Sequence, residues 1–217
     1  MSTDDQQYLS DDELWAMLAE SQGSERVDVL FELAERASAR GDESRAMTLV
    51  GEAEATANAA DDPVAEARAV FQQGVLLYRA AEYTDSADRY QRAAGLFASV
   101  AKDGWASSAH WGRADALRAM GDYEGWLAAS LDARASAESE GDLVLFGNAS
   151  LMQARALYYL DREEESLQAC QDARDAYRQV GLPGRVGQVD DFAITVLLYL
   201  GGTDRALDLA RGCVVLA

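Results

Sequence analysis

The sequence has few of the residues that build covalent or metal-bound scaffolds. Its 217 residues include two cysteines, two prolines and one histidine. Two cysteines exclude a disulfide-stapled fold, and His110 alone cannot form a multi-histidine metal site. Neither a glycine-rich phosphate-binding loop nor a catalytic-triad pattern is present. Cys170 and Cys213 fall on apolar helix faces, which predicts buried, reduced thiols. We therefore expect no cofactor, no metal and no enzymatic activity.

Positive charge is also scarce. Nineteen lysines and arginines face 38 aspartates and glutamates, giving a net charge of -19. Such a surface repels the phosphate backbone and anionic lipids, so we expect no direct binding to nucleic acid or to membranes. The longest apolar stretch, Phe192–Leu200, is interrupted by Thr195 and is too short to cross a bilayer. The first 15 residues lack the pattern of a signal peptide, so we expect a cytoplasmic protein.

A repeat of 40 residues organises the chain. Short segments with the character of turns recur at this spacing: Arg40–Asp42, Ala80–Glu82, Met120–Asp122, Leu160–Arg162 and Leu200–Gly202. Small residues recur before the turns (Ala34, Gly74, Ala114, Ala154, with Ile194 as the exception) and after them (Ala53, Ala93, Ala133, Ala173 and Cys213). Small residues at one level let two antiparallel helices approach closely. The repeat therefore predicts stacked helix pairs.

The stretches between the turns are rich in helix-forming residues and show no strand-like alternation. The first helix of each pair, called helix A below, is expected near residues 25–39, 63–80, 105–119, 143–159 and 185–200. The second, helix B, is expected near 43–59, 84–101, 123–139, 163–179 and 203–216. A capping box beginning at Ser10 predicts an extra helix over 10–21.

The segment from Met120 to Leu127, with Ala114 before it and Ala133 after it, resembles the tetratricopeptide repeat. The segment 81–87, flanked by Gly74 and Ala93, follows the same pattern. The resemblance covers about residues 23–217, in the extended 40-residue variant found in kinesin light chains and bacterial regulators. It implies an all-α, right-handed solenoid of five helix-turn-helix repeats, with residues 1–22 as an acidic N-terminal segment carrying the extra helix. Residues 23–217 are expected to form one domain.

The same resemblance implies a concave groove lined by the A helices, which binds a protein or an extended peptide. The predicted partner-binding residues are Arg68, Phe71, Tyr78, Trp111, Arg118, Asn148, Arg155 and Tyr158. Aromatic and arginine side chains supply most anchor energy at interfaces, and guanidinium groups suit a carboxylate ligand. Two alternatives stay open for these residues: packing between layers for the aromatics, and internal pairing of the arginines with Asp115 and Asp191.

The expected function is that of a non-catalytic adaptor, scaffold or regulator. A signalling-peptide sensor is one alternative. Another is an acidic mimic that inhibits a nucleic-acid-binding protein, because residues 1–62 carry a net charge of -12. The last predicted helix ends without a polar cap, so Val214 and Leu216 are candidates for a homodimer contact.

Overall fold

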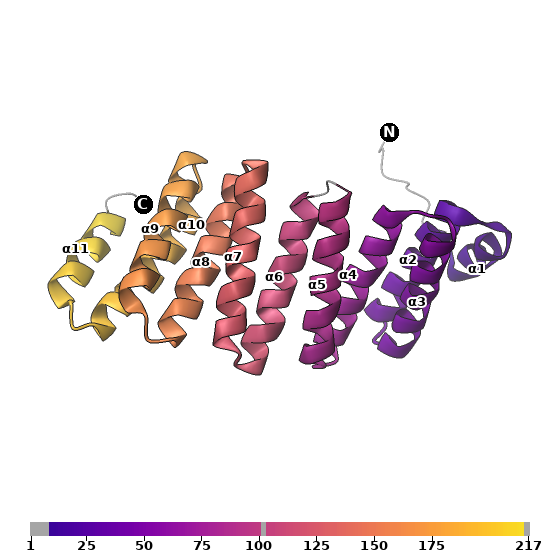
Figure 1. Cartoon of the computed structure of the whole chain (residues 1–217), viewed down its shortest axis with the longest axis horizontal. Helices are drawn as coiled ribbons and strands as arrows, with labels where there is room; N and C mark the ends of the chain where they lie inside the picture. The colour runs from indigo at the N-terminus through magenta and orange to yellow at the C-terminus, as the bar shows by residue number, and fades with distance from the viewer. Residues whose placement is uncertain (1–8, 101–102, 215–217) are drawn as a thin grey trace, which may run out of the picture. The chain divides into compact units, whose positions relative to one another are not determined.

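The computed structural model describes residues 9–100 and 103–214, and these residues form eleven α-helices and no strand (Figure 1). The helices are α1 (Asp11–Glu20), α2 (Gly23–Ala39), α3 (Glu43–Ala59), α4 (Pro63–Arg79), α5 (Tyr83–Ser99), α6 (Asp103–Met120), α7 (Tyr123–Glu140), α8 (Leu143–Tyr159), α9 (Glu163–Gln179), α10 (Pro183–Tyr199) and α11 (Thr203–Val214). Consecutive helices pack in pairs, so the predicted all-α repeat architecture is confirmed. The bounds agree with those expected from the sequence to within two residues.

The chain reverses through the same backbone geometry at eight successive turns, from α2–α3 to α10–α11, the α5–α6 connection being outside the described residues. In each turn one residue adopts a positive φ, between 53° and 80°. These residues are Gly41, Asp61, Ala81, Gly121, Gly141, Asp161, Gly181 and Gly201. The next amide donates to the carbonyl five residues earlier, as from Asp42 to Ala37 at 2.9 Å. This closure ends each helix after a fixed length.

Four of the turns end in an aspartate that caps the following helix. Asp42, Asp62, Asp122 and Asp142 each accept a hydrogen bond from the amide three residues later, at 2.9 to 3.1 Å. Such caps satisfy amides that have no partner inside the helix. The turn therefore stops one helix and starts the next within three residues.

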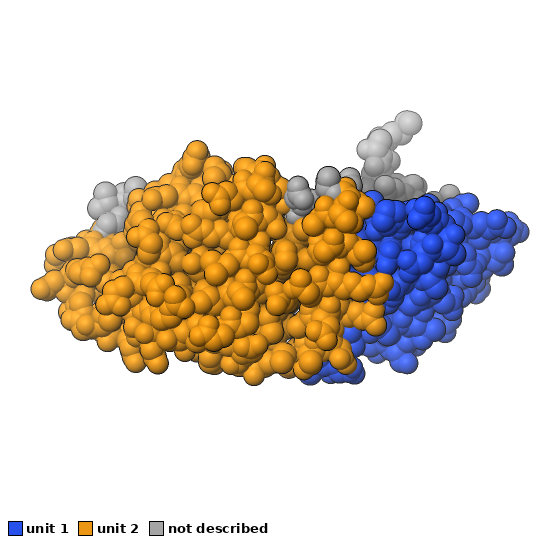
Figure 2. Space-filling model, viewed as in Figure 1, with its two compact units in different colours: residues 1–82 blue, residues 83–217 orange. Residues whose placement is uncertain are grey.

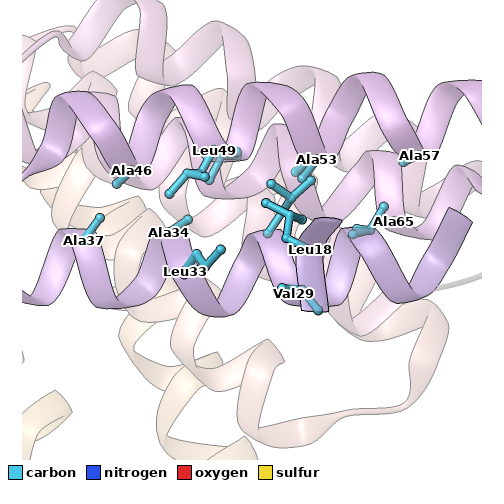
Figure 3. Packing of buried hydrophobic residues seen from close by; sticks show 14 of the residues in the cluster. Leu18, Val29, Leu33, Ala34, Ala37, Ala46, Leu49, Ala53, Ala57 and Ala65 are labelled. Carbon is cyan, nitrogen blue, oxygen red and sulfur yellow. The ribbon is translucent and has the colours of Figure 1, made fainter. Parts of the chain in front are cut away.

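The chain divides into two compact units, residues 1–82 and 83–217 (Figure 2). In the first unit, α2 and α3 lie antiparallel and face each other through small side chains (Figure 3). Ala34 and Ala37 on α2 and Ala46 and Ala53 on α3 belong to one buried apolar cluster. The small-residue column predicted from the repeat is thus a close helix contact. A single domain over residues 23–217 stays a prediction.

The second unit repeats this packing over α5–α11. The small residues Ala114, Ala133, Ala154 and Ala173 are each no more than 1% exposed. Trp126 is also buried, at a level where the other repeats carry Ala46, Ser86, Ser166 and Ala206. Two helical glycines make room for buried tyrosines: Gly112 lies against Tyr90, and Gly147 lies against Tyr177. Each ring occupies the space that a Cβ atom would need.

Helix α1 is held on α2 by both apolar and ionic contacts. Leu14 and Leu18 are buried. Asp11 forms salt bridges with Arg36 and Arg40 of α2. The hydrogen bonds from these guanidinium groups lower the pKa of Asp11 from 3.8 to about 2. The predicted capping box is present, because Ser10 and Glu13 bond reciprocally.

Replacing Ala133 by aspartate should destabilise the second unit by more than about 3 kcal/mol, because the variant places an unpaired carboxylate in a closed helix contact. Urea unfolding measures the change. Ala135→Asp on the exposed face of the same helix adds the same charge and should change the stability by less than about 0.5 kcal/mol. Equal losses in both variants would contradict the close contact at Ala133.

Acidification should release the Asp11 contact. The folded pKa lies below the ordinary value, so the contact's contribution is complete above about pH 4 and is lost as the pH falls through 2. Carboxyl NMR should give a titration midpoint near pH 2 for Asp11. Arg40→Ala should raise that midpoint. A midpoint near 4 in the unaltered protein would show that Asp11 does not hold α1 on α2.

Candidate partner-binding surface

Aromatic side chains gather in the second unit, where α8 and α10 end and α7 begins. The Tyr158 ring meets those of Tyr159, Phe192 and Tyr199 edge-on, with centroids 5.7 to 5.9 Å apart. Tyr159 stacks on Tyr123 at 4.8 Å. These five residues, together with Trp126 beside Tyr159, are called the aromatic cluster below. They come from three helices and two repeats, so ring contacts between the repeats fix their positions.

Part of this cluster faces solvent. The exposed fraction is 54% for Tyr159 and 62% for Tyr199. The neighbouring Leu198 is 52% exposed and Met120, at the end of α6, is 45% exposed. Large apolar groups that lie together on a surface mark a site of interaction more often than single exposed residues do. The cluster therefore offers a firm apolar surface for a partner.

The three arginines predicted to bind a partner have different surroundings. In the first unit, Arg68 lies 3.4 Å from a carboxylate oxygen of Asp28, and its guanidinium group stacks over the Phe31 ring. In the second unit, Arg118 lies 3.3 Å from Asp115. The internal pairing left open by the sequence is thus present at Asp115.

Arg155 is different. Its guanidinium group lies 5.8 Å from the Phe192 ring centre, and no carboxylate of the described residues forms an ion pair with it. Asp191, the other acidic residue considered as a partner, does not pair with it. The side chain is exposed on α8, a helix that contains no aspartate or glutamate. Arg155 is therefore the arginine of the predicted set whose charge is available to a ligand.

Asn148 lies on the same helix, seven residues before Arg155, which is about two turns. Its side-chain oxygen accepts a 2.6 Å hydrogen bond from the hydroxyl of Tyr177, a fully buried residue of α9. This bond fixes the amide group and leaves its nitrogen to donate. Gly147 makes the arrangement possible, because the Tyr177 ring passes directly over it.

The remaining predicted residues are spread over both units. Phe71 and Tyr78, on α4 of the first unit, are half-buried and both have partners within the protein. Trp111 on α6 is 36% exposed, whereas Leu151, which follows it in the same repeat column, is buried in the core. The side chain of Val214 and the whole of Leu216 lie outside the described residues.

Buried polar groups in the second unit are structural. Arg174 and Asp190 form an ion pair, with side chains 12% and 4% exposed. Cys170 is buried as expected, and burial raises the pKa of its thiol to about 12, so the thiol stays protonated near pH 7. The side chain of Cys213 lies outside the described residues. Burial also lowers the pKa of His110, which keeps its ring neutral. Among the described residues, no group of three or more potential ligands is placed to hold a metal ion.

None of the helices in the described ranges is long and apolar enough to span a membrane. No protein-family model matches the sequence. No curated protein matches it either. Solved structures do match the fold. The apo form of RapI superposes with a TM-score of 0.81 at 14% identity, over 93% of this chain and 56% of that chain.

Kinesin light chain TPR-like repeats from Podosopora anserina match with a TM-score of 0.69 at 11% identity, over 88% of this chain and 93% of that chain. This is a tetratricopeptide-like repeat fold. A Rap protein complexed with competence and sporulation factor matches with a TM-score of 0.62 at 13% identity, over 94% of this chain and 57% of that one. The chain spans little more than half the length of these Rap proteins. At such identities the likeness establishes the fold alone.

The A-helix pattern in the sequence led to Tyr158, Arg155 and Asn148 but missed four members of the aromatic cluster. Tyr159 and Tyr199 stand 40 residues apart, so the repeat itself carried a signal for that pair. Tyr123 and Phe192 had no such signal, because their role depends on ring contacts made across neighbouring helices.

Gly147→Ala should destabilise the second unit by about 1–3 kcal/mol, because the added Cβ would lie 2.7 Å from a carbon of the Tyr177 ring. Gly187 occupies the equivalent position one repeat later and has no atom within 4 Å of its added Cβ. Gly187→Ala should therefore be neutral or stabilise the protein by up to about 1 kcal/mol. Urea unfolding compares the two. If the effects have the same sign and size, the tyrosine does not depend on Gly147.

Proposed function

We propose that this protein binds another protein or an extended peptide on its A-helix face, without catalysis, as an adaptor, scaffold or regulator. The A helices are α2, α4, α6, α8 and α10. The observation that carries the proposal is the unpaired guanidinium group of Arg155 beside the exposed aromatic cluster. An exposed arginine next to rigid rings is typical of the anchors that dominate interface energies.

The chemistry of this surface favours a ligand with a carboxylate beside an apolar side chain. Arg155 would bind the carboxylate through charge-assisted hydrogen bonds. Tyr158, Phe192 and Tyr199 would pack against the apolar group. Asn148 would donate to a backbone carbonyl of the ligand. A surface of this kind on a chain with a net charge of -19 selects its ligand locally, because the overall field repels anions.

A peptide sensor is a narrower form of the same proposal. The Rap structure that contains competence and sporulation factor supports it by analogy of fold. Arg68, Phe71, Tyr78, Trp111 and Arg118 are proposed as further contacts, each within its own unit. Self-association through Val214 and Leu216 also remains a proposal, as does a single solenoid domain over residues 23–217.

Selection from a random peptide library provides the test. Peptides enriched on the wild-type protein should contain aspartate, glutamate or a free C-terminal carboxylate. Fluorescence anisotropy should show that Arg155→Ala weakens the selected peptides at least tenfold, since hydrogen bonds to charged groups contribute about 1.5–3 kcal/mol.

Arg178→Ala is the matched control, because Arg178 is an exposed arginine on the B helix α9. It should leave the affinities unchanged. Peptides that bind both variants equally would contradict the role of Arg155. Selection of basic peptides whose binding collapses at moderate salt would instead favour the acidic-mimic function.

A further inference from the structure

The first unit contains a cavity of about 450 Å³ between α2 and α4. Its walls include Phe31 and Ala34 of α2 and Val75 and Leu76 of α4. The volume falls in the range of about 300–1,000 Å³ that is usual for ligand pockets. The sequence placed Phe31, Glu35, Ser38 and Val75 on the groove side of their helices, and the cavity brings all four together.

Two charged residues line this cavity, and only one of them is neutralised inside the protein. Arg79 donates a 2.6 Å hydrogen bond to the hydroxyl of Ser38 and lies 4.0 Å from Glu43. Ser38 in turn donates to the Glu43 carboxylate at 3.1 Å. Arg79, Ser38 and Glu43 therefore form a closed network in which the positive charge already has an anionic partner.

Glu35 is the second charged residue of the wall. Its side chain is exposed to the cavity side, and it forms no hydrogen bond or ion pair with any described residue. It stands among apolar groups, since Phe31, Ala34 and Val75 line the same space. A carboxylate beside apolar walls matches a side chain with a long aliphatic stem and a cationic head.

The charge of the surrounding chain points the same way. Residues 1–62, which supply α1, α2 and α3, carry 16 acidic and four basic side chains. The resulting field attracts cations over distances of about 10 Å at ordinary salt. The field and the unpaired carboxylate therefore favour the same class of ligand.

We propose that this cavity is a subsite for an arginine or lysine side chain of a basic partner segment. The aliphatic stem would lie along Phe31, Val75 and Leu76, and the cationic head would bind the Glu35 carboxylate. Arginine fits this role better than lysine, because its guanidinium group is less strongly hydrated and can bind a carboxylate through two hydrogen bonds. This inference is independent of the proposal for Arg155, which concerns the second unit and an anionic group.

Two small probes of equal shape test the proposal: N-acetyl-arginine methylamide and N-acetyl-citrulline methylamide, whose urea group is neutral. Each is titrated into the full-length protein and followed by amide NMR. The arginine probe should shift signals of α2 and α4 in a saturable manner. The citrulline probe should bind at least fivefold more weakly, because it lacks the charge that Glu35 recognises. The lysine analogue of the probe measures the preference between the two cations.

Glu35→Gln should weaken the arginine probe to the level of the citrulline probe. Glu52→Gln is the matched control: it removes the same charge from an exposed site on α3 that does not line the cavity, so it should bind like the wild type. Equal binding of both probes, or no binding of either, would overturn the proposal. So would equal losses in the two variants, since a general acidic field would then account for the binding. Arg155→Ala should leave this titration unchanged, which separates a failure here from a failure of the proposed function.

Discussion

The structure depends on a left-handed residue that recurs every 20 positions. It closes each helix after the same length, and the next helix begins two residues later. Because the interval does not vary, equivalent residues of successive helix pairs stand at the same height. Small residues can then meet small residues along each unit. Glycine adopts this conformation without strain, but Ala81 also holds a φ of 62°, at a cost of about 1–2 kcal/mol. Even an unfavourable residue is thus held in the conformation that the spacing demands.

Close helix contacts leave little room for large side chains in the middle of each pair. The buried tyrosines Tyr90 and Tyr177 fit only where a glycine faces them. Other rings gather at helix ends, where the helices begin or stop and the packing is more open. Tyr159 and Tyr199 follow this pattern and remain more than half exposed. The candidate binding surface is therefore a consequence of the packing rule: the tight interior displaces the aromatic residues to places where a partner can reach them.

Much of this architecture could be predicted from the sequence, because it depends on local signals that repeat. Turn residues, small-residue columns and helix-forming stretches each recur at a fixed interval, so their evidence accumulates over five repeats. The 20-residue symmetry went unnoticed, since Asp61 and Asp161 do not resemble the glycines at equivalent turns. The state of each arginine could not be predicted either. Arg118 and Arg155 look alike in sequence, and only the positions of nearby carboxylates make one neutralised and the other available.

The two candidate surfaces respond to the same electrostatic field in opposite ways. The chain's negative charge attracts a cation toward Glu35 and repels a carboxylate from Arg155. Added salt screens both effects, so it opposes binding at the first surface and reduces a penalty at the second. Recognition at Arg155 must therefore come from short-range groups: its own guanidinium, the Asn148 amide and the rings around Tyr158. Recognition at Glu35 can draw on the field as well as on the cavity. A strongly acidic protein of this fold can thus hold two surfaces of opposite selectivity, provided that the one for anions lies on a helix without carboxylates, as α8 does.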